Sequence, residues 1–151
     1  MYDKTVTVFN KYISQKKTYW YPHVISGVDL ITDKGANIAK TGIESADAAN
    51  LHVKYRNVDG NKMVGDYIWL PPKEWKKQVN ENLLKSITFE SGDFFMLGTY
   101  PTDVIADEDY ESGISSTGFY DFMNKNHDFV FLITNVGGPY TLIPHFEIGG
   151  K

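Results

Sequence analysis

The chain contains no cysteine, and this absence removes several kinds of chemistry at once. Disulfide bonds, thiolate zinc sites and cysteine nucleophiles all require the missing thiol. A chain without thiols suits a reducing cytoplasm, where disulfides rarely persist. At 151 residues, the chain has the usual size of one domain and is large enough for a hydrophobic core without such staples.

Long apolar runs and a net positive charge are also missing. No run approaches the roughly 18 apolar residues of a membrane span, and the polar opening Met1 to Thr5 does not have the pattern of a signal peptide. We therefore expect a protein of the cytosol, or of a particle assembled there, that does not contact a membrane. The formal charge of −4 argues against a large sequence-independent grip on nucleic acid, which needs clustered lysine and arginine.

Aromatic residues are abundant at 15% of the chain, with ten tyrosines, nine phenylalanines and three tryptophans. Such side chains favour pleated, half-buried surfaces and protein interfaces. Short stretches rich in β-branched and aromatic residues, separated by turn residues, predict strands along most of the chain. The predicted strands outside hairpins are residues 5–12, residues 20–31 with an interruption near Pro22 and Gly27, residues 86–89 and residues 94–97.

Two hairpins are predicted from turn residues between such stretches. Residues 51–70 form the first, because an alternating stretch leads into Asp59-Gly60, a strong turn signal, and a second stretch ends at Pro71-Pro72. Residues 129–148 form the second, with a turn at Gly137-Gly138-Pro139. These patterns predict a mainly β fold, a small β-barrel or sandwich with one or two short helices and a C-terminal β-hairpin, in one domain over residues 1–151.

Helices are expected at two places. Pro72 stands at a permitted first-turn position, so a short helix or turn follows it, in which Trp75 and Val79 would share a buried edge. Residues 117–126 form the second helix, because Phe119, Phe122 and Met123 recur at helical spacing. Between them, residues 101–116 are rich in turn and acidic residues and are predicted to form an exposed loop.

Catalytic signatures are scarce. The histidines lie far apart and lack the spacing of a metal site; they are His23, His52, His127 and His145. His145 with Glu147, or His127 with Asp128, could supply a base and an orienting carboxylate, but no nucleophile signature accompanies either pair. We therefore predict no enzymatic activity, no cofactor and no metal.

Two other features have an ordinary explanation. The acidic run of residues 107–111 lacks the regular carboxylate spacing and central glycine of a calcium loop, so a solvated face is the better interpretation. Trp20, Trp69 and Trp75 could form a stacking platform for sugars or bases, but filling a core is the commoner use of tryptophan in a small β domain.

Several short motifs stand out along residues 18–100. They are Trp20-Tyr21 at the entry of a strand, Lys-Gly-Ala-Asn at residues 34–37, Ser-Ala-Asp at residues 45–47, Pro-Lys-Glu-Trp at residues 72–75, and an aromatic, Gly-Asp, apolar strand and glycine across residues 89–98. These motifs resemble those of small minor capsid proteins of tailed bacteriophages of Gram-positive hosts. The likeness covers residues 18–100, a β core similar to head-closure proteins. Residues 101–151, a loop, short helix and hairpin that extend this core, resemble a phage and prophage family of unassigned role.

The resemblance implies a structural protein of the virion, a stopper-like head-completion protein in the phage neck. Such β-barrels form a homo-oligomeric ring of six or twelve copies between portal or adaptor proteins above and tail terminator or tail tube proteins below. DNA passes through the ring's lumen without specific binding, and assembly takes place in the cytoplasm of the host bacterium.

Two loops are the candidate partner-interface or channel segments under this hypothesis. The residues of interest in the first are Asp33, Lys34, Asn37, Lys40, Glu44 and Asp47; those in the second are Asp107, Glu108, Asp109 and Tyr110. Three alternatives stay open: a tail terminator or tail-completion protein, a virion-borne carbohydrate-binding module built on the aromatic residues, and a hydrolase built on His145 and Glu147.

Overall fold

A computed structural model describes residues 2–32, 49–111 and 117–151. Most of the described residues are in strands, so the predicted mainly β fold is confirmed. The six long or central strands are β1 (Lys4–Ser14), β2 (Lys17–Thr32), β3 (Ala49–Lys54), β8 (Phe94–Leu97), β10 (Val130–Tyr140) and β11 (His145–Gly150).

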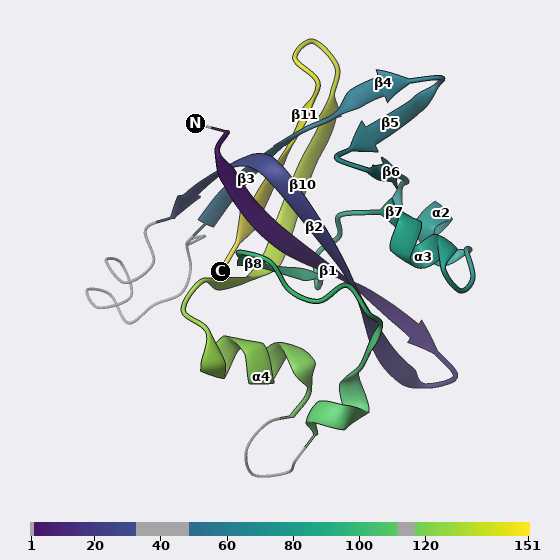
Figure 1. The fold of residues 1–151 in the computed structure, drawn as a ribbon, viewed down its shortest axis with the longest axis vertical. Helices are drawn as coiled ribbons and strands as arrows, with labels where there is room; N and C mark the ends of the chain where they lie inside the picture. Colours follow the sequence, from purple (N-terminus) through teal and green to yellow (C-terminus); the bar gives the residue numbers. More distant parts are fainter. Residues whose placement is uncertain (1, 33–48, 112–116) are drawn as a thin grey trace.

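These six strands close into an antiparallel barrel, drawn in Figure 1. Around the barrel the order is β1, β2, β3, β11, β10, β8, and β8 pairs back to β1. The predicted C-terminal hairpin supplies β10 and β11, so residues after 100 contribute two of the six strands. The boundary predicted at residue 100 is therefore not a structural boundary, because the barrel closes only when β10 and β11 join β8 and β3.

A second, smaller sheet lies beside the barrel. Its strands are β4 (Arg56–Val58), β5 (Asn61–Val64), β6 (Tyr67–Trp69) and β7 (Ser86–Ile87), and β9 (Ile105–Ala106) separately extends β2. The helices are α2 (Pro72–Lys76), α3 (Asn82–Lys85), the 3₁₀-helix η1 (Asp107–Tyr110) and α4 (Phe119–Asn126). The short helix after Pro72 and the helix near residues 117–126 are both confirmed.

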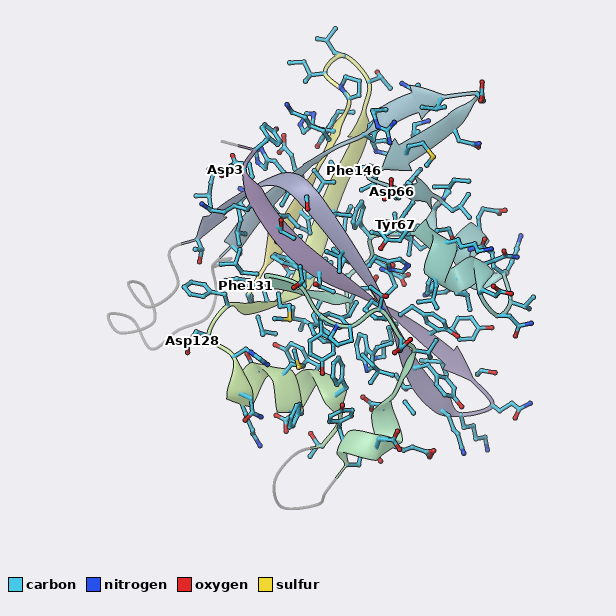
Figure 2. All side chains as sticks on the ribbon, in the orientation of Figure 1. Asp3, Asp66, Tyr67, Asp128, Phe131 and Phe146 are labelled. Carbon is cyan, nitrogen blue, oxygen red and sulfur yellow. The ribbon has the colours of Figure 1, made fainter. Side chains whose placement is uncertain are left out.

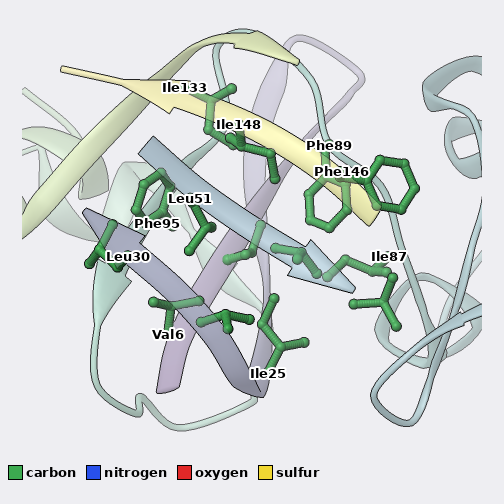
Figure 3. Close-up of a cluster of buried hydrophobic side chains, with 14 of the residues drawn as sticks. Val6, Ile25, Leu30, Leu51, Ile87, Phe89, Phe95, Ile133, Phe146 and Ile148 are labelled. Carbon is green, nitrogen blue, oxygen red and sulfur yellow. The ribbon is translucent and has the colours of Figure 1, made fainter. Parts of the chain in front are cut away.

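The barrel interior is a packed core and not a pore. Phe131 and Phe146, labelled in Figure 2, are fully buried, and Figure 3 shows the same cluster from nearby. Fully burying one such side chain stabilises the fold by about 1.5–3 kcal/mol. The buried members of the cluster are Val6, Val8, Ile25, Val28, Leu30, Ala49, Leu51, Val53, Tyr55, Val64, Ile87, Phe89, Phe95, Phe131, Ile133, Phe146 and Ile148.

The opposite face of β1 is covered as well, because successive residues of a strand point to opposite faces. Phe9 faces away from the barrel interior, stacks on Phe94 with ring centroids 4.5 Å apart and meets Phe119 of α4 edge-on at 5.3 Å. Phe119 and Met123 are fully buried, as the helical spacing predicted, and Phe122 packs at the edge of the cluster. This second core fixes α4 against the barrel.

Two strand predictions were wrong in detail. Pro22 and Gly27 do not interrupt β2: Pro22 pairs with Phe9, and Gly27, at φ +70°, lies in a bulge where the register with β1 shifts. A bulge adds one residue to one strand and bends it without ending the pairing. Val79 is 61% exposed and shares no buried edge with Trp75, because α2 ends at Lys76.

For the hairpin predicted over residues 51–70, the position of the turn is confirmed, but the pairing of its two strands was wrong. Asp59 and Gly60 both have positive φ, as the predicted tight turn requires, and join β4 to β5. However, β3 pairs with β2 and β11, whereas β6 pairs with β5. The alternating pattern located the strands, but their partners depend on barrel closure.

Candidate functional site

The β10–β11 hairpin projects from the barrel, and Figure 1 shows its turn at the top of the molecule. The predicted turn at Gly137-Gly138-Pro139 was wrong, because β10 runs through these residues to Tyr140 and the chain reverses over residues 141–144. The glycines instead lie at an irregular stretch, where Gly137 pairs with Glu147 and Tyr140 with His145. A side chain at Gly138 would be strained, because its φ is +102° and a Cβ would lie 3.0 Å from the His145 carbonyl oxygen.

The tip of this hairpin is apolar and exposed. Leu142 is 96% exposed and Ile143 is 68% exposed, the two highest values among the exposed large hydrophobic residues of the described chain. The tip is held from below, since Tyr55 donates its hydroxyl to the Tyr140 carbonyl at 2.7 Å and its backbone N–H to the Pro144 carbonyl at 3.3 Å. Leu142 and Ile143 were not predicted from the sequence as site residues. The position of this apolar pair between Pro139 and Pro144 could have indicated an exposed apolar turn.

His145 connects the tip to the barrel wall. Its Nδ1 lies 2.6 Å from the Ile143 carbonyl oxygen and its Nε2 lies 2.9 Å from Glu147. Both partners only accept hydrogen bonds, so the arrangement favours the doubly protonated ring. The Ile143 carbonyl and then Glu147 raise the pKa of His145, and the bond from His145 lowers the pKa of Glu147.

This geometry bears on the hydrolase alternative. His145 and Glu147 do form a hydrogen-bonded pair, beside His52, whose ring centroid is 6.1 Å from that of His145. Yet a general base needs a ring nitrogen that can take a proton from a substrate, and both nitrogens of His145 are held by its own hairpin. The pair therefore orients the tip, and its arrangement gives no support to proton transfer.

The acidic segment predicted as an exposed loop is a 3₁₀-helix packed against α4. Asp107 accepts hydrogen bonds from the Trp20 indole at 2.9 Å and from the Phe119 backbone N–H at 2.8 Å. Tyr110 packs against Phe119 and Phe122. These two residues therefore hold α4 in place.

The other two predicted residues of that segment lie on the surface. Asp109 is exposed, and Glu108 is exposed and lies 3.6 Å from the Lys17 ammonium group. The other predicted loop, with Asp33, Lys34, Asn37, Lys40, Glu44 and Asp47, lies outside the described residues.

A tyrosine-lined cavity lies at the other end of the molecule, where β1 turns into β2. Its volume is about 330 Å³. Two of its apolar lining residues are exposed, since Val79 is 61% and Val104 44% exposed. The cavity is lined by Tyr12, Ser14, Tyr19, Tyr21, Val79, Asn80, Leu83 and Val104.

A buried carboxyl group lies beside a second cavity, of about 360 Å³, which Lys11, Lys76 and Glu90 also line. Asp93 is 1% exposed and accepts hydrogen bonds from the Lys11 backbone N–H and the Asn10 amide, both at 2.9 Å. Burial raises the pKa of Asp93 to about 7. Because Asn10 also donates to the Thr88 carbonyl at 2.7 Å, the pair ties β1 to residues 88–93 and is part of the framework.

The tryptophans do not form a stacking platform. Trp75 is fully buried and Trp20 is 4% exposed, while Trp69 packs against Phe146 with ring centroids 5.0 Å apart. Their rings fill the core, as the commoner use of tryptophan suggests. The carbohydrate-binding alternative therefore loses the tryptophan platform.

The described residues contain neither a cluster of metal-binding side chains nor a helix that could span a membrane. Within residues 2–32, 49–111 and 117–151, no three histidine, aspartate or glutamate side chains are placed to hold a metal ion. In the same ranges, no helix has the length and apolar character needed to cross a membrane.

The fold and the surface together define a small closed-barrel protein whose most exposed apolar residues stand on a projecting hairpin. The chain belongs to DUF6751, a family of unknown function, whose model matches residues 1–151. No curated protein and no solved structure matches the chain.

Proposed function

We propose that this protein is a structural component of the neck of a tailed-phage particle, where copies of it form a ring that closes the DNA-filled head and docks the tail. The observation that carries the proposal is the exposed pair Leu142-Ile143 at the tip of the β10–β11 hairpin. An apolar pair on a projecting hairpin is costly to leave in water and is typical of a contact with another protein.

The closed barrel supports contact through hairpins. Within the described residues, each of the six barrel strands has a partner on both sides over at least part of its length, which leaves little free edge inside the barrel to which another copy could add a strand. The elements that extend beyond the barrel are the β1–β2, β4–β5 and β10–β11 hairpins (Figure 1), and these are the elements best placed to meet another copy. The hairpin tip with the largest apolar exposure is the strongest candidate among them.

The charge of the chain also suits this role. The chain carries −4 overall, and Glu108 and Asp109 are exposed. Binding to DNA depends on neutralising phosphates with lysine and arginine, so an acidic ring lets DNA pass without holding it. The resemblance of residues 18–100 to phage minor capsid proteins agrees with the same role.

The test is to delete the gene from the phage or prophage that carries it and to examine the particles by electron microscopy. Heads without DNA or without tails, lying beside complete free tails, are expected. Filled heads with normal tails would overturn the proposal, and joined tails of abnormal length would assign the protein to tail completion instead.

Complementation connects the phenotype to the hairpin. A wild-type copy is expected to restore joined particles, whereas L142D is expected to fail because it places a charge in an apolar contact. The matched control is V58D, which places the same charge on the neighbouring β4–β5 hairpin, where Val58 is 40% exposed. Full rescue by L142D would mean that the hairpin tip makes no contact that joining of heads and tails requires.

A further inference from the structure

We propose that the β10–β11 tip of one copy docks into the tyrosine-lined cavity of the next copy, and that this head-to-tail contact forms the ring. The inference rests on the proposed function and names the two surfaces that meet. The occupant of the cavity is the Leu142-Ile143 pair of a second copy of this chain.

The two surfaces lie at opposite ends of one molecule. In Figure 1 the β10–β11 turn is at the top, and the β1–β2 turn that borders the cavity is at the lower right. A tip cannot therefore reach the cavity of its own chain. A ring needs this arrangement, because each copy must offer two different, complementary patches to its two neighbours.

The cavity offers apolar surface on which the aliphatic tip can pack. The tip offers two adjacent aliphatic side chains, and the cavity of about 330 Å³ is lined mainly by tyrosine rings, Val79, Leu83 and Val104. Tyrosine is enriched in such contacts because its ring packs on an apolar side chain while its hydroxyl stays hydrated. Docking would also cover Val79 and Val104, which are 61% and 44% exposed.

Exposed charges of opposite sign adjoin residues of the two surfaces along the chain. Tyr55, which anchors the tip, is flanked by the exposed cations Lys54 and Arg56. The cavity residues Asn80 and Val104 are flanked by the exposed acids Glu81 and Asp103. Opposite charges around an apolar contact steer association and fix its orientation.

Four exposed cations, Lys16, Lys17, Lys77 and Lys85, also lie in the segments that border the cavity, and three of them have an acid of their own chain within 4 Å. Lys77 lies 3.4 Å from Glu74, and Lys17 lies 3.6 Å from Glu108. Lys85 lies 3.9 Å from Glu81, but both side chains are more than 70% exposed, and ion pairs of this kind contribute little. Glu81 therefore remains able to exchange Lys85 for a cation of a second copy.

The absence of cysteine makes the contact directly testable. The double variant L142C/V79C carries one thiol on the tip and one at the cavity, so a short bis-maleimide cross-linker should join each copy to its two neighbours. In particles from the complemented phage, denaturing gels are expected to show a ladder of covalent multimers. The matched control is L142C/F129C, whose second thiol replaces Phe129, 41% exposed and outside the cavity.

The yield of multimers decides the outcome. At least about tenfold more cross-linking is expected for L142C/V79C than for the control, because docking raises the effective concentration of the two thiols. Equal yields overturn the inference. Particles that contain the double variant and are joined normally, without a ladder, overturn the contact but not the function. Absence of the wild-type protein from normally joined particles overturns both.

Charge reversal provides an independent test of orientation. K54E/R56E is expected to reduce the number of joined particles, and adding E81K/D103K to the same chain is expected to restore it. E81K/D103K alone should reduce joining as K54E/R56E does. Failure of the four-fold variant to restore joining, while each pair folds normally by circular dichroism, would refute the proposed orientation.

Discussion

Two buried titratable groups are expected to have opposite effects on stability. Burial raises the pKa of Asp93 to about 7 and lowers the pKa of His23 to about 4. Between about pH 4.5 and 6, the folded protein therefore holds a proton on Asp93 that the unfolded chain releases, since an ordinary aspartate titrates near 3.9. In the same range, the unfolded chain holds a proton on His23 that the folded protein excludes.

The sign of each contribution follows from these proton counts. Stability rises with pH wherever the unfolded state binds more protons. His23 therefore makes the unfolding free energy rise as the pH rises from its depressed pKa towards the ordinary value. Asp93 makes the unfolding free energy fall as the pH rises from the ordinary aspartate value towards its elevated pKa. Each contribution is about 1.4 kcal/mol per pH unit, so the two nearly cancel in the wild type.

The variant D93N removes one contribution and leaves the other. Its unfolding free energy relative to wild type should increase by about 2 kcal/mol from pH 4.5 to pH 6, which is 1.5 units at about 1.4 kcal/mol each. H23Q should change by the same amount in the opposite direction. D93N also places an amide donor near the Asn10 amide, so the stability of this variant at any one pH will be lower. The quantity to compare is therefore how the stability difference from wild type changes with pH.

Urea unfolding followed by tryptophan fluorescence at several pH values measures these free energies. Exposed groups such as Glu147 and Asp121 titrate in all three proteins and cancel in the comparison. A constant difference between D93N and wild type across this pH range would mean that Asp93 is not protonated in the folded state, and the reasoning from burial would be wrong.

Two further predictions use matched pairs. W75F should lower the unfolding free energy by about 1–3 kcal/mol, because it leaves the Ser86 carbonyl without the indole N–H that donates to it at 3.0 Å. W69F should cost less in thermal denaturation, because the buried Trp69 N–H has no hydrogen-bond partner among the described residues; an equal cost would contradict this. D107A should cost about 2–4 kcal/mol, because Trp20 and Phe119 lose a shared acceptor, whereas D109A on the exposed face should stay within about 0.5 kcal/mol. Comparable stability of D107A and D109A in urea would show that Asp107 does not hold α4.

The order of residues along the chain was sufficient for local structure. The helical spacing of Phe119 and Met123 predicted α4, and Asp59-Gly60 predicted a tight turn, because these signals act between near neighbours. The mainly β class followed from alternation and aromatic content in the same way. The burial of Trp75 and Trp20 was likewise the expected use of these side chains.

Tertiary structure decided everything that depends on distant partners. Barrel closure determined that β3 pairs with β2 and β11 rather than with β6, and that Pro22 and Gly138 lie within strands. It also placed Asp107 within hydrogen-bond distance of the Trp20 indole and the Phe119 backbone N–H, which lie 87 and 12 residues away in the sequence. The acidic segment therefore helps to hold α4. Local pattern cannot specify such contacts, because antiparallel pairing and burial depend on which strands the closed barrel places side by side.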